Sequence, residues 1–485
     1  MSLSIEDQGF VPSRFRVSGI RLLAAAVFFA ASLTPSLIPR EPLMQGALSG
    51  ISGALGYGIG VLIGVAWRLM RLPGLEARAA RQANMALIAV SAALAIFALI
   101  RAADWQNATR RIMDLEPVET LHPLIVGLVT LGVFAVLVGL GKMFAIVFRW
   151  LTRKIEPVLP GLVGPVVGLF VTIAVFWSLI DGILVRAVMG AADDLFATIE
   201  QTFDDGKPQP TDPLMTGSPA SLISWDDLGN RGRDFIARTP TAEEIGGFWG
   251  DGAMRPVRVY VGRVSADNAE ARAELALAEL IRTGGFDREI LIITTPVGTG
   301  WMDPGSHDAI DFMFGGNTAH VAAQYSYLTS VLSILTNVEY GLDQARTLFD
   351  VIYAHWSALP QDQRPRLYIH GLSQGALNSQ ATLPLLDVLG DPFHGALWAG
   401  SPFVSPVWAD VRRDRADGSP VWRPVYGNGS LIRVTNQEDT LDNSRADWGP
   451  IRMVLLHYGS DPIVNFDIAT IWRRPEWLAN QRPPD

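Results

Sequence analysis

The chain has no cysteine among its 485 residues. This absence excludes disulfide bonds, thiol nucleophiles and thiolate metal sites, and it is compatible with any cellular compartment. Charge is also sparse, because only 18% of the residues are charged, and the formal net charge is −9. An acidic chain argues against a nucleic-acid partner, which would require a basic face. The length predicts two or more domains.

Charged residues are scarcest between residues 20 and 185. Several apolar stretches there reach the roughly 20 helical residues that a bilayer crossing needs. The predicted spans are 19–39, 46–67, 84–100, 123–147 and 160–184. Residues 1–186 are therefore predicted to form an all-α transmembrane domain of about five helices. A cleaved signal peptide over residues 1–32 is the alternative, but the apolar run continues to Ile38, which favours an anchor.

The basic residues predict an orientation for these spans. They gather in the N-terminal tail and in the second and fourth loops, as Arg14, Arg16, Arg21, Arg68, Arg71, Arg78, Arg81, Arg149, Arg153 and Lys154. Because cytoplasmic loops are enriched in Lys and Arg, the tail is predicted to be cytoplasmic. An odd number of spans then places everything after residue 185 outside the cytoplasm. Splitting or losing one span would reverse this prediction.

Glycines recur at helical spacing within the apolar half, at Gly50, Gly53, Gly56, Gly60, Gly64, Gly161, Gly164 and Gly168. Glycines four residues apart let neighbouring membrane helices approach closely. We expect packing within the helix bundle, and an oligomer face is the alternative. The segment Gly56-Tyr-Gly-Ile-Gly superficially resembles a dinucleotide loop, but no strand precedes it, so no cofactor is predicted.

Residues 187–220 are acidic and then rich in proline, which is typical of a linker. Beyond it, residues 221–485 alternate between strand and helix patterns. The predicted strands are 257–262, 289–295, 320–325, 367–370, 395–400, 431–436 and 452–457, and the main helices are 268–281, with Asp267 as its N-cap, 342–356 and 376–389. This alternation predicts a doubly wound, mostly parallel sheet, which binds ligands at the carboxyl ends of its strands.

The most informative motif is Gly371-Leu372-Ser373-Gln374-Gly375, which follows an apolar strand and precedes a helical segment. This context is typical of the nucleophile elbow of the α/β-hydrolase fold. The glycines are needed because the turn is crowded and strained. Ser373 is therefore the predicted nucleophile. The alternative is a glycine-rich turn with an idle serine.

A serine nucleophile needs a base, and the base needs an orienting carboxylate. His457 follows a strand and is the predicted base, and Asp461 is the predicted acid. The usual order in this fold is Ser, acid, His, and no histidine follows Asp461. Three assignments stay open: His457 with Asp439 or Asp442, His457 with Asp461, or a site that lacks its base and is impaired or completed by another chain.

The oxyanion hole is predicted to combine the backbone N–H of Gln374 with one from the loop 295–301. Gly298 and Thr299 are the predicted donors there, because Gly298 and Gly300 allow the backbone to approach a substrate closely. An ordinary glycine-rich loop is the alternative. His307 and His320 do not have metal-ligand spacing, so no metal is predicted.

Several stretches together carry a resemblance that spans nearly the whole chain: 32–40, 224–229, 295–301, 324–327, 448–450, 457–464 and 472–477. With these motifs the chain resembles a bacterial family of multipass membrane proteins that carry an α/β-hydrolase domain. The resemblance implies the bacterial inner membrane and a serine hydrolase, without an established substrate. Relatives have Gly-Glu-Ser-Leu-Gly at the elbow and run on into a segment with further histidines. If the base lies there, Asp461 is the acid and His457 a bystander.

The predicted function is a membrane-anchored serine hydrolase that acts through an acyl-enzyme on an ester or thioester. The membrane half favours a lipid or envelope-derived substrate, and membrane lipids are the predicted partners. Acyl transfer to an acceptor other than water would use the same residues. The competing hypothesis is a non-catalytic membrane protein that keeps the hydrolase fold as a binding or assembly module. A transporter is disfavoured because the spans have few polar residues.

Overall fold

The computed structural model describes residues 19–35, 40–73, 76–112, 116–120, 122–157, 159, 163–179, 206–327, 338–383, 390–438, 441 and 444–475. The chain divides into two compact units, Met1–Ile180 and Asp181–Asp485. We call them the helical unit and, because it contains the candidate active site, the catalytic unit, and we describe each by itself. Asp439 and Asp442, two of the predicted acids, lie outside the described residues.

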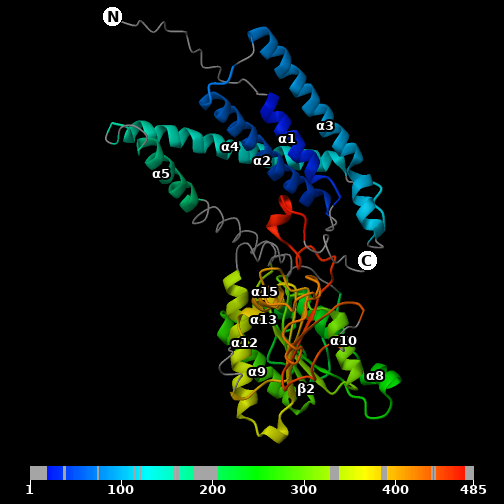
Figure 1. Ribbon diagram of the computed structural model, residues 1–485. Helices are drawn as coiled ribbons and strands as arrows, with labels where there is room; N and C mark the ends of the chain where they lie inside the picture. Colours follow the sequence, from blue (N-terminus) through cyan, green and yellow to red (C-terminus); the bar gives the residue numbers. More distant parts are fainter. Residues whose placement is uncertain are drawn as a thin grey trace, which may run out of the picture. The chain divides into compact units, whose positions relative to one another are not determined.

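The helical unit consists, in its described part, of five helices (Figure 1). They are α1 (Gly19–Ser32), α2 (Pro42–Leu69), α3 (Ala77–Ile112), α4 (Pro123–Ile155) and α5 (Val163–Leu179). Helices α2, α3 and α4 are long and apolar enough to cross a membrane, whereas α1 and α5 are apolar but shorter. The predicted spans 46–67, 84–100 and 123–147 each lie within one of the three long helices. These helices are consistent with membrane association.

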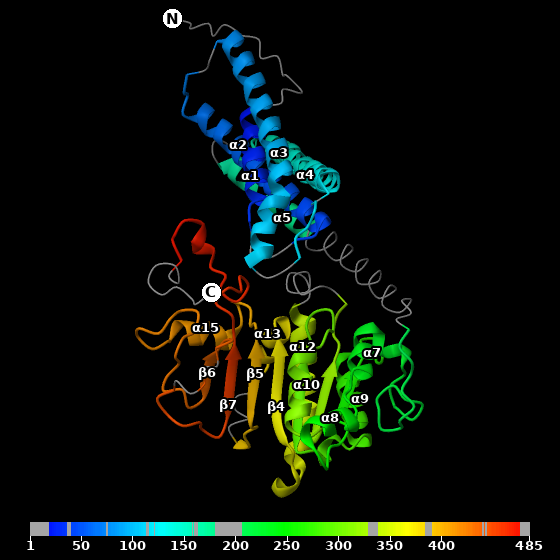
Figure 2. The ribbon, with the colours of Figure 1, turned by 90° about the vertical axis from the view of Figure 1, so that its right-hand side faces the viewer.

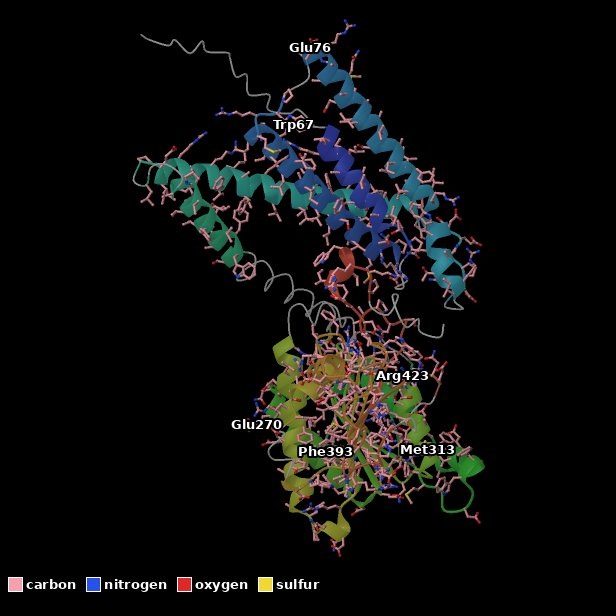
Figure 3. The ribbon with its side chains drawn as sticks, viewed as in Figure 1. Trp67, Glu76, Glu270, Met313, Phe393 and Arg423 are labelled. Atoms are coloured by element: carbon pink, nitrogen blue, oxygen red, sulfur yellow. The ribbon has the colours of Figure 1, made fainter. Side chains whose placement is uncertain are left out.

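Large apolar side chains cover the outside of the helical unit, as Trp67 on α2 illustrates (Figure 3). Its interior instead contains glycines at the helix contacts. A Cβ on Gly56 would lie 2.4 Å from the carbonyl oxygen of Ala24, and one on Gly50 would lie 2.7 Å from the Cβ of Val133. The predicted close approach is therefore present at these positions. The prediction is wrong at Gly64, because a Cβ there would meet nothing within 4 Å.

The catalytic unit is built on a seven-stranded sheet in which every pair of neighbouring strands is parallel. The strand order is β1-β3-β2-β4-β5-β7-β6. Figure 2 labels β4, β5, β7 and β6 in this order. The strands are β1 (Val257–Val261), β2 (Ile290–Thr295), β3 (Thr318–Ala323), β4 (Arg366–Leu372), β5 (Gly395–Ala399), β6 (Ile432–Thr435) and β7 (Arg452–Leu456). All seven predicted strands are present, and the predicted parallel sheet is confirmed.

Helices cover both faces of this sheet (Figure 1). They are α7 (Gly229–Ala237), α8 (Ala242–Trp249), α9 (Ala269–Arg282), α10 (Pro304–Met313), α12 (Val338–Ala358), α13 (Gln374–Ala381) and α15 (Pro406–Arg413), with short 3-10 turns η2 (Asp226–Leu228), η3 (Gly285–Asp287), η4 (Gln361–Gln363) and η5 (Ile468–Ile471). The sequence patterns did not predict α8, α10 or α15. The N-cap predicted for α9 was wrong by one residue. Asn268, not Asp267, has the extended backbone and accepts from the N–H of Ala271.

Strands β1, β2 and β3 are buried along their whole length, which is typical of parallel strands covered on both faces. The described part of the predicted linker, residues 206–220, also contacts the catalytic unit. Thr216 and Ser218 are buried in it, and a Cβ on Gly217 would lie 2.6 Å from the ring of Trp225. This segment packs against the core rather than standing away from it.

Candidate active site

The strand order places one crevice at the carboxyl edge of the sheet. Strands β2 and β4 are neighbours, with Thr295 paired to Gly371 at their ends. The chain leaves β2 for β3 on one side, and it leaves β4 for β5 on the other. Ligands of open α/β sheets bind where the connections diverge in this way. The topology therefore brings the loop after β2 and Ser373 after β4 to the same place.

Ser373 occupies the sharp turn between β4 and α13. Its φ of 53° and ψ of −118° lie in a region that non-glycine residues avoid, at a cost of about 1–3 kcal/mol. Two hydrogen bonds hold the turn: the N–H of Ser373 donates to the carbonyl of Ala399 at 2.8 Å, and the N–H of Leu377 donates to the carbonyl of Ser373 at 3.1 Å. The half-buried serine stands at the N-terminus of α13, where the helix dipole favours negative charge.

The two glycines of the motif permit three segments to meet at this turn. A Cβ on Gly371 would lie 2.6 Å from the carbonyl carbon of Gly375, and a Cβ on Gly375 would lie 2.0 Å from the carbonyl oxygen of Thr295. Gln374, the first residue of α13, is fully buried beside them. The start of α13 therefore packs against the end of β2, where the predicted oxyanion loop begins.

The carbonyl groups of that loop are held by side chains from neighbouring strands. The hydroxyl of Tyr260 donates to the carbonyl of Gly300 at 2.8 Å, and the side-chain amide of Gln324 donates to the carbonyl of Thr299 at 3.1 Å. Gly300 has a φ of 82°, which favours glycine. Among the described residues, the backbone N–H groups of Gly298 and Thr299 donate to no backbone carbonyl. The loop thus has fixed carbonyls and two N–H groups that can serve a ligand.

Asp461, the predicted acid, lies after β7 at the same edge. Its Oδ1 accepts from the backbone N–H groups of Ile463 at 2.8 Å and Val464 at 3.2 Å, which fixes the carboxylate in an Asx turn. Its Oδ2 faces Gly400: a Cβ there would lie 3.7 Å from Oδ2 and 4.0 Å from Cδ1 of Leu372. The carboxylate therefore lies beside the end of β5 and close to the residue that precedes Ser373.

His457, the predicted base, is almost completely buried. Its Nε2 accepts from the backbone N–H of Ser401 at 3.1 Å, and its ring packs edge-on against Trp408. Burial, and then the positive charge of Arg412, lowers the pKa of His457 to about 3. Among the described residues, its Nδ1 has no hydrogen-bond partner. Among the described residues no hydrogen bond joins this imidazole to Ser373, and its Nε2 lone pair is engaged by the N–H of Ser401.

The remaining histidines are also within the described residues. His394 accepts from the N–H of Leu367 at the start of β4, at the opposite edge of the sheet. His355 packs against Phe286, and His122 belongs to the helical unit. None of these three has a hydrogen bond to Ser373 in the part of the chain that the structure describes. The predicted serine and acid thus share an edge of the sheet, and among the described residues neither has a hydrogen bond to a histidine.

A buried histidine cluster under α10 escaped the sequence analysis. His307 and His320 share a hydrogen bond between their Nδ1 atoms at 2.9 Å. Nε2 of His320 bonds Oδ1 of Asp311 at 2.7 Å, and the guanidinium of Arg258 donates to Oδ2 of Asp311 at 2.6 Å. The ring of His370 contacts that of His307 edge-on. The cluster ties α10, which directly follows the oxyanion loop, to β1, β3 and β4.

Protonation in this cluster follows from burial and charge. Burial lowers the pKa of His370 to about 4, and burial, with the neighbouring rings and Arg258, lowers the pKa of His307 well below its usual value. Burial acts to raise the pKa of Asp311, but His320 and Arg258 outweigh it and hold that pKa below its usual value. Within the described residues, no group of three or more potential ligand side chains is arranged to hold a metal ion.

Two family models match the chain. The first, described as the alpha/beta-hydrolase family, matches residues 257–485, and the second, described as the N-terminus of that family, matches residues 33–240. None of the curated proteins matches this chain. Among solved structures, the Trichoderma reesei cutinase in complex with a C11Y4 phosphonate inhibitor is 15% identical, with a TM-score of 0.21, and the match covers 39% of this chain and 74% of the cutinase.

Proposed function

We propose that this chain, which belongs to the alpha/beta-hydrolase family, is a membrane-anchored serine hydrolase that acts on an ester or thioester. The observation that carries the proposal is the strained backbone of Ser373 at the point where the connections of β2 and β4 diverge. Backbone strain of this kind persists where the surrounding structure imposes it, and such positions cluster at active sites. A serine without a role in catalysis would not require this strained backbone.

In the proposed reaction, the Ser373 hydroxyl oxygen attacks the acyl carbon while a base takes its proton. The developing oxyanion is stabilised by the N–H of Gln374 together with that of Gly298 or Thr299. Collapse of the tetrahedral intermediate expels the alcohol or thiol, which takes up the proton, and leaves an acyl-enzyme. Water then attacks the acyl-enzyme, the carboxylic acid departs, and the serine regains its proton.

Asp461 is the proposed acid, because its fixed carboxylate lies at the same edge as Ser373. Two assignments of the base remain. His457 could serve only if its Nε2 were released from the N–H of Ser401. The alternative is a histidine supplied by another polypeptide that enters between Ser373 and Asp461. The two assignments differ in what His457 does: it is the base in the first, and it supports the turn after β5 in the second.

The apolar helices of the helical unit support a lipid or envelope-derived acyl substrate and a location in the bacterial inner membrane. The bias of the basic residues supports a catalytic unit outside the cytoplasm. Because the chain has no cysteine, a single Ser357→Cys variant provides one reactive thiol on α12. An impermeant maleimide added to intact cells should label it. Labelling only after lysis would place the catalytic unit in the cytoplasm.

A fluorophosphonate probe tests the enzyme directly, because it reacts with an activated serine. We expect the full chain in detergent to be labelled, Ser373→Ala to remain unlabelled, and Ser357→Ala, at a serine on α12 outside the proposed site, to behave as the unmodified chain. Loss of labelling in His457→Ala would identify that residue as the base. Full labelling of His457→Ala would exclude His457 as the base.

The second candidate function is a non-catalytic binding or assembly module. It is favoured by one observation: among the described residues, which include all seven histidines, no imidazole is hydrogen-bonded to Ser373. A folded, unmodified chain that no fluorophosphonate labels would support this candidate and contradict the hydrolase. Slow labelling restored by a histidine-containing partner would instead support the hydrolase.

A further inference from the structure

The carboxyl edge of the sheet carries a second feature, a pocket of about 350 Å³. Its walls come from α15, which follows β5, and from residues 465–475, which follow β7. Five arginines line it: Arg412, Arg413, Arg415, Arg473 and Arg474. Asp467 is the one acidic residue among the described residues of its lining. We call this feature the basic pocket, and it stands out in a chain whose net charge is −9.

Among the described residues that line the basic pocket, arginines outnumber carboxylates. Arg413 is paired with Asp410 and Asp414. Asp467 uses a side-chain oxygen to cap η5. Among the described residues, the exposed side chain of Arg473 has neither a hydrogen bond nor an ion pair with a side chain. The basic pocket therefore keeps a surplus of positive charge.

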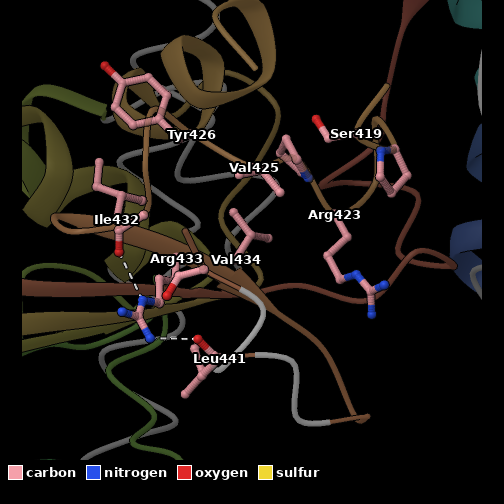
Figure 4. A pocket seen from close by; sticks show the side chains of 12 residues that line it. Ser419, Arg423, Val425, Tyr426, Ile432, Arg433, Val434 and Leu441 are labelled. Atoms are coloured by element: carbon pink, nitrogen blue, oxygen red, sulfur yellow. Dashed lines mark hydrogen bonds between the residues drawn. The ribbon is translucent and has the colours of Figure 1, made fainter. Parts of the chain in front are cut away.

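Another pocket of the catalytic unit shows what a structural arginine looks like (Figure 4). There, the guanidinium of Arg433 donates to the carbonyls of Gly429, Leu441 and Ala446, and it lies 3.9 Å from the ring centroid of Trp448. Its donors hold the loops around β6 in place. In the basic pocket, Arg415 likewise donates to the carbonyl of Arg412, and the guanidinium of Arg412 lies over the ring of Trp408. These two arginines support the structure around a hollow that Arg413, Arg473 and Arg474 also line.

Large apolar side chains border the basic pocket. Phe403, which lines it, contacts Phe466 ring to ring, with centroids 4.8 Å apart. Ile468 and Trp472, on and beside η5, are 55% and 68% exposed. We call these four residues the apolar rim. Exposed aromatic and aliphatic side chains beside arginines are typical of protein surfaces that lie at the interface of a bilayer.

We propose that the basic pocket binds the phosphate of an anionic phospholipid, with the apolar rim against its glycerol and acyl region. Guanidinium groups bind phosphate with paired hydrogen bonds, and clustered arginines attract anionic lipids. Apolar side chains at the rim gain by leaving water for the acyl region. The proposal does not depend on Ser373. It places a bound lipid at the same edge of the sheet as the proposed nucleophile.

Calorimetric titration of the full chain in an uncharged detergent tests this site. The ligands are dihexanoyl phosphatidylglycerol, dihexanoyl phosphatidylcholine and glycerol 3-phosphate. We expect phosphatidylglycerol to bind at least tenfold more tightly than phosphatidylcholine, because the headgroup of the latter has no net charge. Glycerol 3-phosphate should bind more weakly than phosphatidylglycerol, because it does not reach the apolar rim. Equal binding of the two lipids would overturn the proposal.

Matched variants locate the site. The double variant Arg413→Gln/Arg473→Gln should raise the Kd for phosphatidylglycerol about tenfold or more. The control Arg238→Gln/Arg346→Gln removes the same charge from exposed, ion-paired positions elsewhere and should leave the Kd unchanged. Trp472→Ala should weaken phosphatidylglycerol but not glycerol 3-phosphate. If both double variants lost the same affinity for phosphatidylglycerol, the effect would be due to net charge alone. If glycerol 3-phosphate bound as tightly as phosphatidylglycerol, the pocket would be a site for free phosphate esters. Either result would overturn the lipid site.

Discussion

The helical unit and the catalytic unit use the same residue types in opposite ways. The first exposes large apolar side chains and buries glycines, such as Gly50 and Gly56, at its helix contacts. The second buries its apolar side chains around a sheet, and it also encloses the histidine cluster with the ion pair between Arg258 and Asp311. In lipid, helices satisfy their own backbone groups, so contacts between helices depend on close packing. In water, apolar burial supplies enough stability to enclose paired charges.

The largest expected effect tests the glycine at the elbow. Gly375→Ala would place a Cβ 2.0 Å from the carbonyl oxygen of Thr295, so a backbone segment would have to shift, which is costly. We expect complete loss of fluorophosphonate labelling and a destabilisation of about 3 kcal/mol in urea unfolding of the catalytic unit. The control is Gly247→Ala on α8, where a Cβ meets nothing within 4 Å, so stability should change by less than about 1 kcal/mol. Equal stability of the two variants would contradict the crowding at the elbow.

The next effect concerns the buried charges, which among the described residues lie in the catalytic unit. Asp311→Ala removes the carboxylate that Arg258 and His320 share, so we expect a loss of about 3 kcal/mol in the free energy of unfolding. Asp350→Ala breaks the exposed pair with Arg346 and should cost less than about 1 kcal/mol. Chemical denaturation of both variants measures the difference. Similar values would show that the histidine cluster contributes no more than a surface ion pair.

A smaller effect is expected in the helical unit. Gly56→Ala would bring a Cβ to 2.4 Å from the carbonyl oxygen of Ala24, which should separate α1 from α2 and cost about 1–2 kcal/mol. Gly58→Ala changes the same helix where a Cβ meets nothing within 4 Å. Detergent-induced unfolding, followed by circular dichroism, compares the two. Gly58→Ala should be neutral or slightly stabilising, and a reversed order would contradict the packing of α2 on α1.

The last effect is a pH dependence of the catalytic unit, which is small for each pH unit. Burial lowers the pKa of His370 to about 4 and that of His457 to about 3, so both stay neutral in the folded chain when the unfolded chain takes up protons. Stability is therefore fully present above about pH 6.5 and falls toward pH 4, by about 1.4 kcal/mol per pH unit for each histidine. His457→Gln should reduce this slope by one proton, whereas Ser357→Ala should not. An unchanged slope in His457→Gln would refute the burial argument.

Local patterns predicted much of this molecule. Apolar length located the long helices, and apolar runs located all seven strands, because burial on both faces requires continuous apolar stretches. The motif around Ser373 predicted its turn, since Gly371 is required by its contact with Gly375 within the motif, whereas the contact that requires Gly375 comes from the distant Thr295. Helix α10 was missed because its polar residues, Asp311 and His307, face inward toward Arg258 and His320. The sequence did contain a signal for this cluster, because Arg258 and His320 are polar residues within the apolar strands β1 and β3.

What the sequence by itself determined is local: the division into apolar and mixed halves, the strands, and the turn that presents Ser373. What the tertiary structure decided is which distant segments meet. Strand β7 pairs with both β5 and β6, so Asp461 reaches the end of β5 while His457 turns inward to Ser401. Two short arginine groups, 412–415 and 473–474, form one pocket only because β5 and β7 are neighbours. Strand order is set by long-range packing, which local periodicity does not encode.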